Sequence, residues 1–171
     1  PERFSRSAMK RFNEQQLASA SLKVAAMDIR QKEAVMDEIF KSQPNLLASV
    51  LVLPQMGNSL EHVEVLLNVL LVIHELVRAS GKTLKQVSES EQDQYVSRFV
   101  AHLKSVGDLR SAKANRAIDA YVKAHPEKVL LAYAIGEMQK AGFTELQHDA
   151  SKYLFISGIG LVNCVAYGKY L

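Results

Sequence analysis

Apolar residues recur along this chain at the spacing of helices, and no stretch alternates apolar and polar residues as a half-buried strand does. Glycines stand where several of these apolar segments end, as expected for residues that close helices. The pattern predicts an all-α, single-domain bundle of about eight helices without a sheet. The expected helical segments are residues 7–42 (one long helix or two end to end, with a break near Ser19–Ser21), 45–56, 59–80, 89–106, 112–124, 126–141 and 144–169, with a weaker turn at 83–87.

Helix starts are marked by residues that can bind free backbone N–H groups. We expect capping boxes at Asn58-x-x-Glu61, Thr83-x-x-Gln86 and Thr144-x-x-Gln147. Pro44 and Pro126 suit the first turn of the helices that follow them, because the missing N–H would have no partner there.

The segment 59–80 is apolar almost all round and is therefore expected at the centre of the bundle. Two polar residues, Glu64 and Asn68, interrupt it, and we expect Asn68 to be a buried, hydrogen-bonded group. The segment 144–169 is the expected counterpart in the second half of the chain.

Residues 35–49 and 117–133 resemble each other. Asp, Lys and Pro recur at an offset of 82 residues, and a Leu-Leu-Ala triplet follows at an offset of 84. This predicts two duplicated helix-Pro-helix-helix halves, about 23–81 and 111–171, although two amphipathic helices can also match by chance.

The composition is that of a globular protein: 48% hydrophobic and 23% charged residues in a chain of 171. Sixteen uncharged residues lie between Lys152 and Lys169, fewer than the roughly 20 that span a bilayer, so a buried helix is favoured over a membrane span. With one cysteine and no visible signal peptide, a cytoplasmic location is expected.

The net charge of +3 is too small for a dedicated nucleic-acid-binding protein. Basic residues gather at the start of the chain, however, and we expect residues 1–12 to form a partly mobile basic segment preceding one helical domain, 13–171. The side chains that could contact phosphates or an acidic partner are Arg3, Arg6, Lys10 and Arg11.

Small residues recur at Gly160, Cys164 and Gly168, spaced to share one helix face. Such a face lets a neighbouring backbone approach closely, either within the chain or across a dimer seam. Cys164 itself lies in an apolar segment, where a thiol is usually inert.

No catalytic motif is recognisable in the sequence. Glu145-x-x-His148 resembles half of a di-iron motif, but no second copy exists, so neither a metal nor a cofactor is expected. His62, His74 and His148 are the candidates for an active site without a local motif.

These observations favour a non-enzymatic helical module that binds another protein or its own copy. A nucleic-acid-associated accessory protein that uses the basic segment is one alternative. An enzyme with a site near one of the three named histidines is the other.

Overall fold

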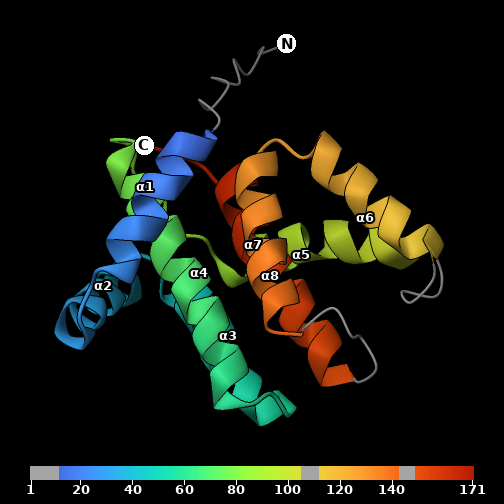
Figure 1. The fold of residues 1–171 in the computed structure, drawn as a ribbon, viewed down its shortest axis with the longest axis horizontal. Helices are drawn as coiled ribbons and strands as arrows, with labels where there is room; N and C mark the ends of the chain where they lie inside the picture. Colours follow the sequence, from blue (N-terminus) through green and yellow to red (C-terminus); the bar gives the residue numbers. More distant parts are fainter. Residues whose placement is uncertain (1–11, 105–111, 143–148) are drawn as a thin grey trace.

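The computed structural model describes residues 12–104, 112–142 and 149–171. Within these ranges the chain forms eight α-helices, one short 3-10 helix and no strand, packed together as one all-α domain (Figure 1). The predicted fold class is therefore confirmed. In chain order the elements are α1 (Glu14–Ala25), α2 (Ile29–Ser42), α3 (Pro44–Leu51), η1 (Leu53–Met56), α4 (Leu60–Ala79), α5 (Glu89–Lys104), α6 (Ala112–Ala124), α7 (Lys128–Lys140) and α8 (Asp149–Tyr167).

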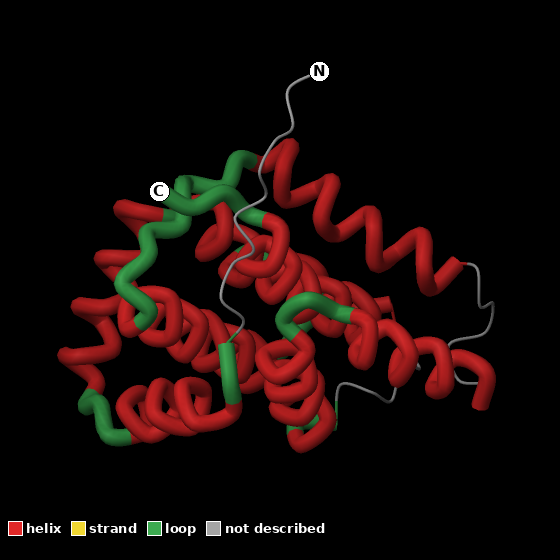
Figure 2. Tube along the Cα trace, turned by 90° about the horizontal axis from the view of Figure 1, so that it is seen from above, coloured by secondary structure: helices red, strands yellow, loops and turns green. Residues whose placement is uncertain are grey.

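Helices α4 and α8 form the centre of the bundle. Helix α4 contacts α1, α2, α3, α7 and α8, and α8 also packs against α5 and α7. Figure 2 shows the same packing of helices from above, with the described loops in green. Both central helices are apolar on most of their circumference, and only a position inside a bundle removes such a surface from water.

The N-terminal region contains two helices, α1 and α2, separated at Ala26–Asp28. The predicted break near Ser19–Ser21 is wrong, because these serines lie inside α1. The signal for the actual break is a capping box: the Asp28 carboxylate accepts from the Gln31 N–H, and the Gln31 side chain accepts from the Asp28 N–H. A similar capping box starts α1.

The two prolines of the sequence match occupy different places. Pro44 is the first residue of α3, as predicted, whereas Pro126 lies in a turn before α7 begins at Lys128. The prediction that Pro126 belongs to the first helical turn is therefore wrong. In this turn the Glu127 N–H donates to Nδ1 of His125. The duplication of the two halves stays a prediction.

The cap of α4 lies one residue later than predicted. Ser59 accepts a hydrogen bond from the His62 N–H at 3.2 Å, while the side chain of Asn58 donates to the Leu53 carbonyl at 3.3 Å. Asn58 is thus used to close the turn around Gly57, whose φ of 89° is left-handed, and it is not available as the cap.

Residues 83–87 do not form the predicted helical turn. They pass between Gln43 and the C-terminal residues. The Gln43 side chain donates to the carbonyls of Leu84 and Lys85 and accepts from the Val87 N–H, all within 3.2 Å. The Lys85 N–H donates to the Lys169 carbonyl at 2.8 Å. These bonds satisfy backbone groups that a helix would have paired, so the Thr83 pattern does not start one.

At two glycines of α8, side chains from other helices of the same chain occupy the space that a Cβ would need. A Cβ at Gly160 would lie 2.8 Å from Cγ2 of Val96 in α5, and a Cβ at Gly158 would lie 2.5 Å from Sδ of Met138 in α7. The neighbour at Gly160 is therefore a side chain, and the predicted approach of another backbone is wrong at this position.

Replacing Gly160 by leucine should destabilise the fold, because Val96 already fills the space that the new side chain needs. We expect a loss of about 1–3 kcal/mol in thermal or denaturant unfolding. Gly136 in α7 is the matched control: a Cβ there meets nothing within 4 Å, so Gly136→Ala should gain about 0.5–1 kcal/mol from helix propensity. A Gly160→Leu variant as stable as the wild type would contradict this packing.

Candidate functional site: an acidic groove between α2, α4 and α7

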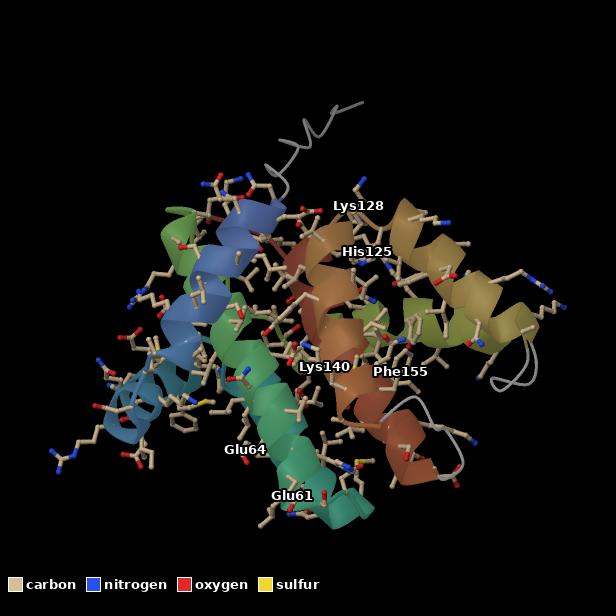
Figure 3. All side chains as sticks on the ribbon, viewed as in Figure 1. Glu61, Glu64, His125, Lys128, Lys140 and Phe155 are labelled. Atoms are coloured by element: carbon tan, nitrogen blue, oxygen red, sulfur yellow. The ribbon has the colours of Figure 1, made fainter. Side chains whose placement is uncertain are left out.

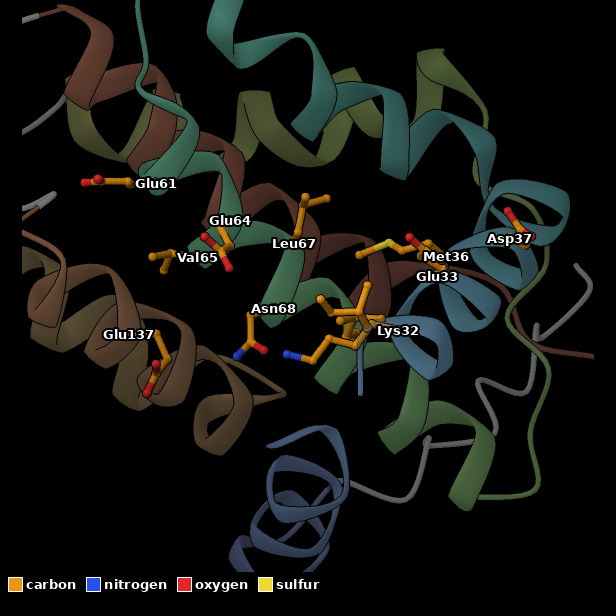
Figure 4. A pocket seen from close by; sticks show the side chains of 12 residues that line it. Lys32, Glu33, Met36, Asp37, Glu61, Glu64, Val65, Leu67, Asn68 and Glu137 are labelled. Carbon is orange, nitrogen blue, oxygen red and sulfur yellow. The ribbon is translucent and has the colours of Figure 1, made fainter. Parts of the chain in front are cut away.

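A groove of about 550 Å³ lies between α2, α4 and α7 (Figure 4). Its volume falls in the range of clefts that bind ligands and peptide side chains. The lining residues are Ile29, Lys32, Glu33, Met36 and Asp37 of α2, Glu61, Glu64, Val65, Leu67, Asn68 and Leu71 of α4, and Glu137 of α7.

The floor of the groove is apolar. Met36 of α2 and Val65, Leu67 and Leu71 of α4 supply this surface. Ile29, at the start of α2, stands beside it with 75% of its surface exposed. Exposed apolar surface rimmed by polar residues occurs at protein-interaction surfaces and in ligand-binding grooves.

The rim of the groove is acidic. Glu137 forms an ion pair with Lys140 at 2.9 Å. The other four carboxylates form no ion pair with any residue that the structure describes; they are Glu33, Asp37, Glu61 and Glu64. Figure 3 shows Glu61 and Glu64 along the first turns of α4, and Lys140 near the end of α7.

Asn68 does not lie in the core as predicted. It is half-buried and lines the groove, and the side chain of Lys32, the one cation of the lining, points toward it (Figure 4). The reason is that α2 and α7 leave this face of α4 uncovered. Glu61, Glu64 and Asn68 recur at helical spacing on one face, so the two interruptions of the apolar segment were the sequence signal for an open face.

Of the residues predicted to contact nucleic acid or an acidic partner, Arg3, Arg6, Lys10 and Arg11 lie outside the described residues. Gly160 and Cys164 of the small-residue face are buried, and Gly160 faces Val96 of α5. Burial raises the pKa of the Cys164 thiol to about 12, so it remains protonated and unreactive. At Gly168 an added Cβ would collide with the Cys164 carbonyl.

The candidate histidines do not converge. His62 and His74 lie twelve residues apart on α4, a separation of roughly 18 Å along the helix, so they cannot share a site. Nε2 of His74 lies 3.2 Å from a carboxylate oxygen of Glu38 at the surface. His148 lies outside the described residues.

A buried polar cluster around Asn163 was missed by sequence reasoning. Asn163 of α8 is fully buried; its Nδ2 donates to the Tyr95 carbonyl at 3.1 Å, and its Oδ1 accepts from Nε2 of His125 at 2.9 Å. The Tyr121 hydroxyl lies 3.1 Å from the same Nδ2. These residues come from α5, α6, α8 and the turn before α7, so no local spacing reveals them. The cluster joins these elements.

The His125 ring is held in one neutral form. Its Nδ1 accepts from the Glu127 N–H, so the ring hydrogen is on Nε2, which donates to Asn163. Burial lowers the pKa of His125 and outweighs these hydrogen bonds.

No group of three or more metal-ligating side chains occurs in the described ranges, and no helix there is long and apolar enough to cross a membrane. Comparison of the chain with protein-family models, curated proteins and solved structures gave no match. The groove is therefore interpreted from its own geometry and charge.

The buried neutral His125 gives a pH prediction. Because its pKa is lower in the folded than in the unfolded protein, the unfolded state binds more protons as the pH falls below about 6.5. The free energy of unfolding should therefore be highest above this pH and decrease toward pH 5. In His125→Gln the amide can still donate to Asn163, and the decrease should be smaller. Urea unfolding of both proteins between pH 5 and 8 measures this; parallel pH profiles would contradict it.

Proposed function

We propose that this protein is a non-enzymatic interaction module whose groove between α2, α4 and α7 receives a basic amphipathic helix of a partner protein. The observation that carries the proposal is the combination of an apolar floor with four carboxylates that lack an ion-pair partner in the described part of the chain.

The shape of the groove favours a helical occupant. Its walls are three helices, and amphipathic helices commonly dock with one apolar face between the helices of a receptor. Leucine, isoleucine or methionine side chains of the partner would cover Val65, Leu67 and Met36. That contact would also remove the largely exposed side chain of Ile29 from water.

The charges favour a basic partner. Glu33 and Asp37 stand one helical turn apart on α2, where two like charges cost roughly 0.2–0.5 kcal/mol without a cation between them. Glu61 and Glu64 repeat the arrangement on α4. Lysines or arginines flanking the apolar face of a partner helix would meet all four carboxylates and accelerate association.

The alternatives receive less support. The acidic groove would repel a nucleic-acid backbone, and the basic residues that favoured this reading lie outside the described ranges. Of the candidate histidines, His74 is engaged in an ion pair with Glu38 at the surface. The cytoplasmic location predicted from the sequence remains part of this proposal.

The docking proposal predicts charge-dependent binding of a fluorescent model helix built from leucine and lysine. The double variant Asp37→Lys, Glu64→Lys should bind this peptide about tenfold more weakly, a change of about 1.4 kcal/mol, in fluorescence anisotropy at low salt. The matched control is Asp93→Lys, Asp119→Lys, which reverses two exposed carboxylates outside the groove and should retain wild-type affinity.

A second peptide with the same lysines and serine in place of leucine tests the apolar floor and should bind much more weakly. Equal loss of binding in the groove variant and in the control would show only general electrostatic attraction. That outcome, or equal binding of the two peptides, would contradict the docking proposal.

A further inference from the structure

A second cavity, of about 190 Å³, lies between α2, α3, the second half of α4 and the loop 82–84. Its walls include four core residues that are each at most 3% exposed: Ile39, Leu46, Leu70 and Ile73. The cavity therefore reaches into the hydrophobic core, where water finds few hydrogen-bond partners.

The lining of this cavity includes basic side chains. His74, Arg78 and Lys82 line it, and no acidic side chain does. Arg78 is directed to Glu75 and Glu38, at 3.1 Å and 3.7 Å, while Lys82 has no ion-pair partner among the residues described. The Lys82 ammonium is consequently the group that an anionic ligand can neutralise.

Several other polar groups of the lining already form hydrogen bonds within the chain. The Gln43 side chain binds the backbone of residues 84–87, and the Ser42 hydroxyl donates to the Glu38 carbonyl. The Thr83 carbonyl accepts from the Leu171 N–H. A ligand therefore meets an apolar interior and a cation of the lining, with few further hydrogen-bonding groups to satisfy.

We infer that this cavity binds a medium-chain aliphatic monocarboxylate, with its chain among the core residues and its carboxylate at Lys82. The volume equals that of about six water molecules at roughly 30 Å³ each, which suits a chain of roughly six to eight carbons. It is smaller than the roughly 300–1,000 Å³ clefts that hold larger ligands. This inference is independent of the groove, which is lined by different residues.

The probe is octanoate, titrated into the ¹⁵N-labelled protein and followed by amide chemical shifts. We expect saturable shifts around residues 39–46 and 70–84, with octanol and octylamine binding at least about tenfold more weakly. Binding of all three compounds with equal affinity would overturn the assignment of a carboxylate.

Matched variants test the site. Lys82→Glu should weaken octanoate binding about tenfold, whereas Lys85→Glu, a neighbouring exposed lysine outside the lining, should leave it unchanged. Val77→Phe places a larger side chain at a partly buried wall position and should abolish binding while circular dichroism shows an intact fold.

Three results would overturn the inference: no saturable binding of octanoate, equal effects of the two lysine variants, or octanoate binding that survives Val77→Phe in the folded protein. Binding of a peptide with a free C-terminal leucine at the same residues, with none of octanoate, would also overturn it, since the ligand would then be a protein terminus.

Discussion

Enclosing α4 is the constraint on which the rest of the structure depends. Nine of its twenty residues are buried, on several sides of the helix, so neighbours must approach it from several directions. Helices α1, α3, α7 and α8 supply most of this cover. The cover is incomplete in two places. The acidic groove lies beside the first half of α4, and the cavity whose lining includes Lys82 lies beside the second half.

One charged residue is enclosed together with the apolar ones. Glu75 of α4 is 2% exposed, and its carboxylate lies 2.7 Å from Nζ of Lys23 and 3.1 Å from Nη2 of Arg78. A buried carboxylate is strongly destabilising without such partners. Because Lys23 belongs to α1, this requirement holds α1 against α4 in one position, where apolar contact alone would allow the helices to slide.

The fold could be predicted from the sequence because it depends on local signals. The span of α6 and the central place of α4 follow from the periodicity of apolar residues. The break before α2 was missed, although Asp28 and Gln31 have the spacing of a capping box. The failure at residues 83–87 is of another kind. That segment pairs with Gln43, some forty residues earlier, and with the C-terminal residues, and no local pattern contains such partners.

The candidate sites were less predictable for the same reason. The groove combines carboxylates of α2 and α4 with Glu137 of α7, more than seventy residues later than Glu61. Only the spacing of Glu61, Glu64 and Asn68 on one face of α4 pointed toward it, and Asn68 was assigned to the core because its neighbours in sequence are apolar. Asn163 and His125 likewise belong to no local sequence pattern, and only the fold brings them within hydrogen-bonding distance.

The net charge of +3 also does not reveal how the charged side chains are distributed over the surface. Five carboxylates and one lysine line the groove, whereas three basic side chains and no carboxylate line the cavity on the other part of α4. Helix α2 borders both, with residues 29–37 at the groove and residues 39–42 at the cavity. Its C-terminal end is joined to residues 84–87 by the hydrogen bonds of the Gln43 side chain. Charge segregated along a shared helix, rather than total charge, therefore distinguishes the two classes of ligand that we propose for these openings.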